Sequence, residues 1–246
     1  MATQQKRLTI GVLIPDEVQL LDLSPIDLFA MLDPSYISAC NLPAPILALA
    51  IPSTIHYISL SAPEVALTAS LVIKTPKTIT DKDVQPGMLD VLLVPGPAPD
   101  AQFGEEVLGF VRRHARSEGC DVLSVCTGCR VLAAAGVLEG KRASAPRGLV
   151  GRLRKEFAGV VWDDERRWVR EGRIWSSGGI TNGQEMVAAY LRYNFPSPTT
   201  ECVLAMADVG EKGEFYPNGN VKETGWWLMQ IIKATVFGGG KRKKLL

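Results

Sequence analysis

Cys126 is the residue of this chain best placed to act as a nucleophile. It follows the apolar run at residues 122–125 and precedes the small residues Thr127 and Gly128. A strand that ends in a nucleophile and turns at once into a helix has the geometry of a nucleophile elbow. Such a turn holds the side chain at the carboxyl end of the strand, where open α/β sheets bind ligands. The free N–H groups and the positive end of the new helix favour a thiolate, so the sequence predicts a reactive Cys126 with a lowered pKa.

Cys126 and Cys129 also form a C-x-x-C pair, which leaves a second chemistry open. In a reducing compartment such a pair can be a redox site in which Cys129 resolves an oxidised Cys126. We expect no metal site, because no second C-x-x-C or neighbouring histidine accompanies the pair. The chain has only two histidines. We expect His56 to be a structural residue of a strand and His114 to be solvated on a surface helix.

Alternating strand-like and helix-like runs must position this elbow. Strands separated by crossover helices predict an α/β fold with a mostly parallel sheet and helices on both faces. Strands are predicted at residues 8–14, 46–51, 55–60, 71–74, 91–94 and 121–125, with a hairpin at 167–176. Helices are predicted at residues 24–33, 105–117, 127–135, 181–192, 200–209 and 222–236.

Composition and charge exclude several classes of protein. Hydrophobic residues make up 46% of the 246 residues and charged residues 22%, which excludes a mainly disordered chain. A net charge of +1 gives no electrostatic footprint for nucleic acid. We expect no membrane association, because no apolar run approaches the roughly 18 to 20 residues of a membrane helix. Five irregularly spaced cysteines and a start without a signal peptide favour the cytoplasm; the basic run at 241–244 leaves a nuclear address open.

Four stretches resemble the ThiJ/PfpI family of the class I glutamine amidotransferase-like superfamily, and within it the isonitrile-hydratase-like branch. The resemblance implies a flavodoxin-like three-layer α/β sandwich, commonly a homodimer, with no cofactor. We expect residues 1–196 to form this domain. Residues 197–246 are expected to be a helical extension packing on it, with a basic tail at 238–246. The stretches are IGVLI with QLLDLSP at 10–14 and 19–25, LLVPG at 92–96, VCTG with AGVLEGKRA at 125–128 and 135–143, and SSGGITNG at 176–183.

The resemblance also assigns roles to three residues. Cys126 matches the elbow nucleophile, and Asp22 matches an acidic residue that faces it from the loop after the first strand. The backbone N–H of Thr127 matches a donor of the oxyanion hole. A carboxyl group beside a thiolate is disfavoured as an anion, so the pKa of Asp22 should rise. A protonated Asp22 could then give a proton to substrate; Asp16 and Glu17 compete for this role.

Two departures from the family pattern limit what the site can do. Many members carry two glycines after the proline that follows the fourth strand, whereas this chain has Pro97, which lacks an N–H. A two-donor oxyanion hole would then need Gly96, Ala98 or a side chain. Several branches place a histidine where this chain has Pro146, so we expect no Cys–His triad.

Other residues at strand ends are candidates for binding a small-molecule substrate. Gly96 and Pro97 follow one predicted strand, and Ser177 and Gly178 follow another. Arg147 could hold an anionic group, although a surface arginine is the plainer reading.

A mechanism without histidine suits addition to a small electrophilic carbon. We expect a cysteine-dependent hydratase or lyase that adds water to an isonitrile-like or activated carbonyl carbon. In this reading Cys126 attacks and Asp22 is the acid/base. The alternatives are a redox-sensing or protective protein without catalysis, a binding domain that has lost catalysis, and a glyoxalase- or deglycase-like enzyme.

Overall fold

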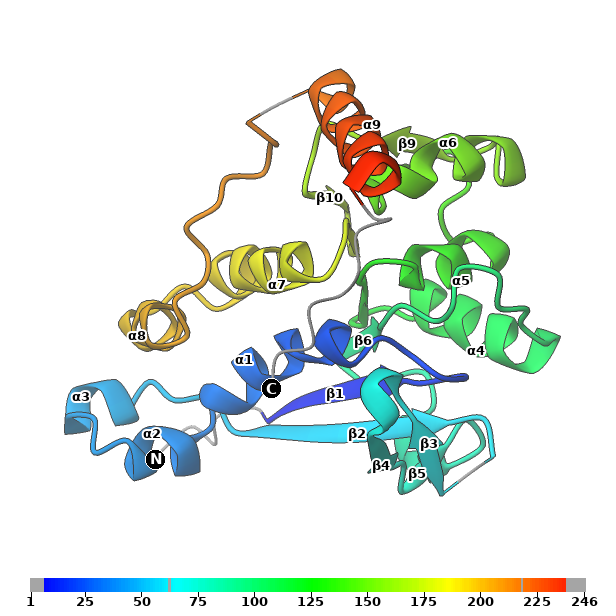
Figure 1. The fold of residues 1–246 in the computed structure, drawn as a ribbon. Helices are drawn as coiled ribbons and strands as arrows, with labels where there is room; N and C mark the ends of the chain where they lie inside the picture. Colours follow the sequence, from blue (N-terminus) through cyan, green and yellow to red (C-terminus); the bar gives the residue numbers. More distant parts are fainter. Residues whose placement is uncertain (1–6, 62, 218, 238–246) are drawn as a thin grey trace, which may run out of the picture.

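The computed structural model describes residues 7–61, 63–217 and 219–237. A seven-stranded sheet forms the middle layer of the molecule, in the order β10-β11-β7-β6-β1-β2-β5 (Figure 1). Neighbouring strands are parallel except β10, which runs antiparallel to β11. The strands of this sheet are β1 (Leu8–Leu13), β2 (Ser53–Ser59), β5 (Lys77–Thr78), β6 (Val91–Val94), β7 (Asp121–Ser124), β10 (Trp168–Glu171) and β11 (Ile174–Ser177).

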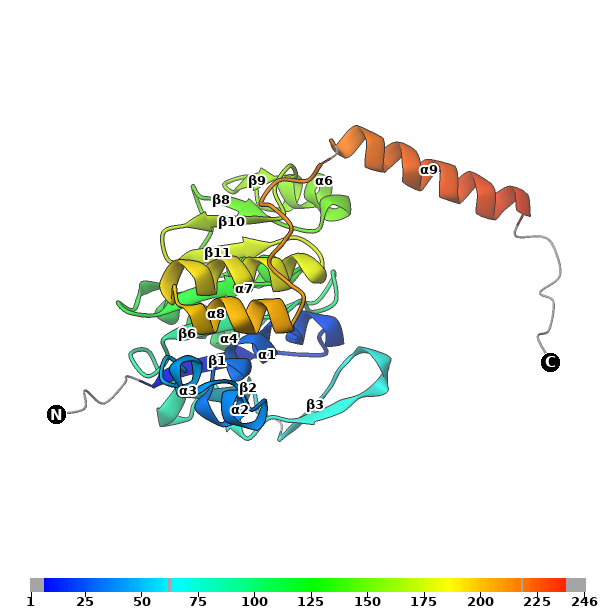
Figure 2. The same cartoon turned by 90° about the vertical axis from the view of Figure 1, so that its left-hand side faces the viewer.

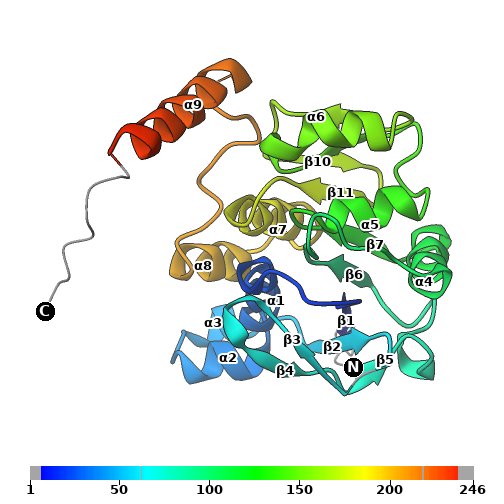
Figure 3. The same ribbon diagram turned by 45° about the vertical axis from the view of Figure 1, so that its right-hand side comes forward.

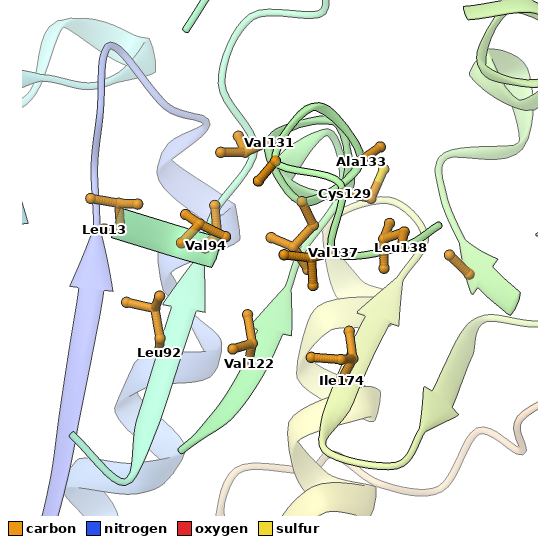
Figure 4. Packing of buried hydrophobic residues seen from close by; sticks show 14 of the residues in the cluster. Leu13, Leu92, Val94, Val122, Cys129, Val131, Ala133, Val137, Leu138 and Ile174 are labelled. Atoms are coloured by element: carbon orange, nitrogen blue, oxygen red, sulfur yellow. The ribbon is translucent and has the colours of Figure 1, made fainter. Parts of the chain in front are cut away.

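Helices cover both faces of the sheet, which confirms the predicted three-layer α/β sandwich. In β6, Leu92 and Val94 face one helix layer, whereas Val91 and Leu93 face the other, as the two-residue period of a strand requires. Figure 4 shows the first cluster, in which Leu92 and Val94 pack with side chains of α5. Helices α4, α5 and α6 contribute to this cluster, and α1, α2, α7 and α8 to the other. The helices are α1 (Pro25–Met31), α2 (Pro34–Ala39), α3 (Ala44–Leu47), α4 (Glu105–Arg116), α5 (Gly128–Ala134), α6 (Arg147–Glu156), α7 (Thr181–Asn194), α8 (Pro198–Met206) and α9 (Asn220–Phe237).

The predicted strand at residues 46–51 is wrong. Pro43 is the N-cap of α3 and Pro45 lies in its first turn, where a missing N–H is tolerated. The position beside β1 is taken instead by β2, which starts at Ser53. The apolar residues of this stretch pack against the α1 side of the core without joining the sheet.

Two small sheets lie outside the main one. The predicted strand at residues 71–74 is found as β4 (Val72–Lys74), paired with β3 (Glu64–Ala66) in a hairpin. Strands β8 (Arg142–Ser144) and β9 (Val161–Asp163) form a parallel pair beside α6.

The two C-terminal helices differ in how they are placed. Helix α8 packs on α1, α3 and α7. Helix α9 projects away from the body of the molecule (Figures 2 and 3). The expected basic tail at 238–246 lies outside the described residues. Among the described residues, no helix combines the length and hydropathy needed to cross a membrane.

Candidate active site

Cys126 lies on a strained turn between β7 and α5. Its φ of 56° is in the left-handed region, which non-glycine residues rarely adopt. Its N–H donates to the carbonyl of Gly178 at 3.2 Å, and the Val125 N–H donates to Val94 at 3.0 Å. A Cβ on Gly128 would lie 2.1 Å from the Val94 carbonyl oxygen, so only glycine allows α5 to start this close to β6. The turn is therefore fixed by two neighbouring segments, the end of β6 and the loop after β11.

The sulfur of Cys126 is surrounded by hydrogen-bonding groups in a half-buried position. The backbone N–H groups of Thr127 and Ile180 donate to it, and it contacts the Asp22 carboxylate. The two N–H groups lower the pKa of the thiol, but burial and the neighbouring Asp22 charge outweigh them and raise it to about 11. The structure corrects the expectation of a lowered pKa, because burial of the sulfur has the larger effect.

Asp22 lies in the short 3₁₀ helix η1 (Leu20–Leu23) and is fully buried beside Cys126. Its Oδ2 accepts a hydrogen bond from the Gly96 N–H at 3.0 Å. Its Oδ1 is buried and has no hydrogen-bond partner within the part of the chain that the structure describes. Burial raises the pKa of this carboxyl group to about 6, although hydrogen bonds from Gly96 and Cys126 oppose the shift. The expected direction is confirmed, but its main cause is burial.

These two pKa values place the proton on the sulfur at neutral pH. Asp22, with a pKa near 6, is ionised, and Cys126, with a pKa near 11, is a thiol that donates to it. The pair thus combines a nucleophile with an adjacent base, as in other assisted nucleophiles. The thiol can lose its proton to Asp22 as it attacks, without a thiolate formed beforehand.

A pocket of about 340 Å³ opens onto the sulfur. Cys126, Thr127, Gly96 and Pro97 line it, and Asp22 lies beneath this wall. A Cβ on Gly96 would lie 2.5 Å from both Asp22 Oδ2 and Thr127 Oγ1, so glycine is required where the three segments meet. The remaining lining residues are Glu17, Val18, Gln19, Thr68, Ala98, Pro99, Pro146 and Leu149.

Comparison with known proteins identifies a family that matches this chain. Residues 40–193 match the DJ-1/PfpI family. The chain belongs to the DJ-1/PfpI family. It is 34% identical over 179 residues to an isonitrile hydratase of Pseudomonas putida, which covers 72% of this chain and 67% of that protein.

Solved structures of the DJ-1/PfpI family share the fold at lower identity. A ThiJ/PfpI family protein of Pseudomonas syringae superposes with a TM-score of 0.67 at 20% identity, covering 94% of this chain and 88% of that one. Drosophila melanogaster DJ-1beta superposes with a TM-score of 0.63 at 14% identity, covering 83% and 99%.

Three residues expected to bind substrate do not line the pocket. Ser177 is buried and its hydroxyl donates to the Ser124 carbonyl at 3.3 Å, which ties β11 to β7. Gly178 uses its carbonyl to hold the Cys126 N–H. Arg147 is 9% exposed, contrary to the surface reading; its Nε donates to the Asp164 carbonyl and its guanidinium lies over the Tyr216 ring. Ser177 and Gly178 therefore hold the backbone next to and at Cys126, and Arg147 joins the start of α6 to the Asp164 segment.

The structure also shows which donors could serve an oxyanion. The Gly96 N–H is already used by Asp22, and Pro97 has none. The Thr127 hydroxyl donates to the Pro97 carbonyl at 2.5 Å. The backbone N–H groups of Thr127 and Ile180 both point at the sulfur, and Ala98 also lines the pocket. Ile180 was not among the site residues predicted from the sequence. Its position between the SSGG stretch and the start of a helix is the signal that could have identified it.

The other candidate groups lie away from this pocket. Cys129 is fully buried in the cluster under α4 and α5, whereas Cys126 packs against the cluster on the other face of the sheet. Burial raises the pKa of the Cys129 thiol, which disfavours it as a resolving thiol. His56 lies in β2, and burial lowers its pKa.

The expectation of a solvated His114 is wrong. Its ring is fully buried, and its two nitrogens lie 2.9 Å from the Phe110 carbonyl and 3.0 Å from the Val84 carbonyl. Val84 ends the 3₁₀ helix η3 (Lys82–Val84), so His114 joins this segment to α4. In residues 7–61, 63–217 and 219–237, no three His, Cys, Asp or Glu side chains are grouped to hold a metal ion.

Proposed function

We propose that this chain is a hydratase that adds water to the terminal carbon of a small isonitrile. The observation that carries the proposal is the Cys126–Asp22 pair, with a thiol next to a buried, ionised carboxylate at the base of a pocket. The 34% identity to an isonitrile hydratase supports the same reaction class. The pair needs no histidine, and none lines the pocket.

The first step joins the sulfur to the isonitrile carbon. As the S–C bond forms, the thiol proton passes to Asp22, which then delivers it to the same carbon. The product is a thioimidate with a C=N bond. Asp22 is suited to this transfer, because its pKa of about 6 lies close to neutral pH.

The second step releases the product with one water molecule. Asp22 activates the water, whose oxygen adds to the thioimidate carbon while one water proton reaches the nitrogen. The C–S bond then breaks, and the sulfur recovers the remaining proton. An N-substituted formamide leaves, and the Cys126 thiol and Asp22 carboxylate are restored.

The pocket favours a small uncharged substrate. Most of its lining is apolar, and no Lys or Arg is among the lining residues. An isonitrile carries no oxygen, so addition of the thiol forms no oxyanion. The missing Pro97 donor therefore matters less than it would for peptide or ester cleavage. A glyoxalase-like reaction produces an oxyanion earlier and fits the site less well.

The test is turnover of an alkyl isonitrile, measured as formation of the N-alkylformamide. We expect Cys126→Ser to abolish turnover and Asp22→Asn to reduce it by about 10²–10⁴-fold, the usual contribution of a positioned acid/base. Cys202→Ser is the matched control, because this half-buried cysteine lies in α8 and should leave turnover unchanged. Full turnover by Asp22→Asn would exclude the proposed proton transfer. Turnover of methylglyoxal but of no isonitrile would favour the glyoxalase-like alternative.

The family resemblance also supports a homodimer as the working assembly. Light scattering on the purified full chain tests this, with a mass twice that of the 26.7 kDa chain expected.

A further inference from the structure

The turn that leads into α7 supplies two of the groups around Cys126, yet its own backbone is strained. The Gly178 carbonyl accepts from the Cys126 N–H, and the Ile180 N–H donates to the sulfur. Ile180 has a φ of 33° and a ψ of −89°, a rare conformation for a β-branched residue. Such a conformation persists only where neighbouring groups hold the backbone in place. The groups that hold residues 178–182 therefore set the direction of one donor to the sulfur.

Tyr216 contacts this turn from the segment that links α8 to α9. Its hydroxyl oxygen accepts a hydrogen bond from Asn182 Nδ2 at 2.7 Å. Asn182 is the second residue of α7 and lies two residues after Ile180. A Cβ on Gly178 would lie 2.7 Å from the same hydroxyl oxygen, so this oxygen also lies against the Gly178 backbone. One hydroxyl group thus contacts both ends of the segment that carries the Ile180 N–H.

Tyr216 is itself held in place by the chain just before β10 and by α6. Its N–H donates to the Glu165 carbonyl at 2.9 Å. Its ring centroid lies 4.4 Å from the guanidinium carbon of Arg147 and 5.0 Å from that of Arg167, and both contacts are cation–π interactions. The Arg167 carbonyl also accepts from the Gly178 N–H at 2.7 Å. Because the ring is fixed, its hydroxyl can hold the turn in one position.

We propose that Tyr216 is a positioning residue for Cys126. Its hydroxyl holds residues 178–182 so that the Ile180 N–H stays directed at the sulfur while the thiol loses its proton. Tyr216 is not among the residues that line the pocket, so it acts through the turn and not on the substrate. The inference rests on the proposed function, because the reaction that it assists is attack by the same sulfur.

The Ile180 N–H matters because negative charge develops on the sulfur as the thiol proton leaves. The N–H groups of Thr127 and Ile180 lower the pKa of the Cys126 thiol, although burial has the larger, opposite effect. Hydrogen bonds to an ionised group are stronger than those between neutral groups, and they weaken steeply when the donor is misaligned. Loss of the Tyr216 hydroxyl should therefore slow the chemical step and leave substrate binding almost unchanged.

The test compares Tyr216→Phe with the unchanged full chain. This variant loses the hydroxyl but keeps the ring between the two guanidinium groups. We expect kcat for an alkyl isonitrile to fall about tenfold or more, with KM within about twofold. The rate at which iodoacetamide alkylates Cys126 at pH 8, followed by peptide mass spectrometry, should also fall about tenfold, because a hydrogen bond to an ionised group contributes about that factor.

A second variant and a matched control separate positioning from a merely structural role. Asn182→Ala removes the other partner of the hydrogen bond, and Tyr216→Phe combined with it should be no slower than the slower single variant. Tyr193→Phe is the control, because this exposed tyrosine also lies in α7 and its ring also packs on an arginine, 3.5 Å from the guanidinium carbon of Arg170. It should leave kcat, KM and the alkylation rate unchanged.

Three results would overturn the proposal. One is a Tyr216→Phe variant whose kcat and alkylation rate equal or exceed those of the unchanged chain. Another is a lowered melting temperature as its only effect, which would indicate a structural role. The third is losses in the double variant that equal the product of the single losses. Alkylation does not depend on the reaction catalysed; if the unchanged chain turns over no isonitrile, the proposed function fails and the alkylation rates alone decide whether Tyr216 positions the sulfur.

Discussion

The Cys126–Asp22 pair shows how burial decides which residue holds the proton. A cysteine at a helix start is expected to ionise easily, yet this sulfur is half-buried and lies against a buried carboxylate. Both groups therefore resist charge, and the carboxyl group, with the lower intrinsic pKa, takes the single negative charge. The reactive state is reached through proton transfer within the pair.

The pH dependence of turnover follows from the pKa of about 6 at Asp22. Asp22 must be ionised to accept the thiol proton, so kcat/KM should rise as pH increases through about 6 and then stay level to about pH 9. The profile of kcat/KM for an alkyl isonitrile measures this ionisation in the free enzyme. A rise centred at pH 8 to 9 would instead indicate that a preformed thiolate is needed.

Alkylation of Cys126 provides an independent check on the same assignment. Its rate should remain low at pH 7 and increase toward the thiol pKa of about 11. In Asp22→Asn the neighbouring negative charge is absent, so the midpoint should move to lower pH.

Asp22 should also reduce stability, because it is buried as an anion. Its pKa rises from 3.8 unfolded to about 6 folded, so the folded state binds its proton more tightly. The contribution of Asp22 to stability is then fully present below pH 4 and falls as pH rises to about 6. At pH 8, Asp22→Asn should be more stable than the unchanged chain by up to about 3 kcal/mol.

Urea unfolding of both proteins at pH 4 and pH 8 measures this difference. An equal difference at the two pH values would contradict the assigned titration. A more stable and less active variant would match the general trade-off between stability and function at active sites.

At the scale of the secondary-structure elements, the site depends on how closely α5 approaches the end of β6. Gly128 and Gly96 are the contact points, and neither leaves room for a Cβ. The same closeness brings the Thr127 N–H and the Asp22 carboxylate to one sulfur. The elements thus determine the geometry that the individual residues use.

Gly128→Ala tests this closeness. Its Cβ would meet the Val94 carbonyl oxygen at 2.1 Å, so α5 must shift away from β6. We expect a loss of about 1–3 kcal/mol in the free energy of unfolding and at least a tenfold loss of turnover. Gly148→Ala in α6 is the matched control, since a Cβ there meets nothing within 4 Å. That control should leave turnover unchanged and increase stability by up to about 1 kcal/mol.

At the scale of the whole molecule, the C-terminal part divides into a strap and a projecting helix. Residues 210–217 cross the body: the Tyr216 N–H donates to the Glu165 carbonyl, and the buried Glu185 carboxylate accepts from the N–H groups of Gly210 and Lys212. Helix α9 follows this strap and leaves the body (Figure 3). Helix α8 and the strap are both packed on the preceding elements. The expected division at residue 196 stays a prediction.

Two truncations separate these roles. Ending the chain at Pro217 should leave stability within about 0.5 kcal/mol and turnover unchanged, because α9 contributes little to the body. Ending it at Val209 removes two donors from buried Glu185 and the Tyr216 ring from Arg147, so we expect a loss of about 2–5 kcal/mol. Thermal unfolding and isonitrile turnover of the two truncated chains measure both effects; a stable chain ending at Val209 would show that the strap is dispensable.

The sequence by itself determined the features that depend on neighbouring residues. The apolar runs of β1, β6 and β7, the strand–cysteine–glycine turn, and the helix start at Pro25 all follow from local patterns. Four such patterns in order were enough to place the chain in its family. These features depend on residues that are close in the sequence, so they can be predicted without coordinates.

Only the tertiary structure decided which side chains are buried and what they face. His114, Arg147 and Ser177 carry polar groups that a sequence places at the surface or in a pocket, yet each is buried against backbone carbonyls of distant segments. The proton on Cys126 is likewise decided by a carboxylate more than a hundred residues away in the chain. Desolvation and electrostatic interactions depend on distances in space, so they become known only when the chain is folded.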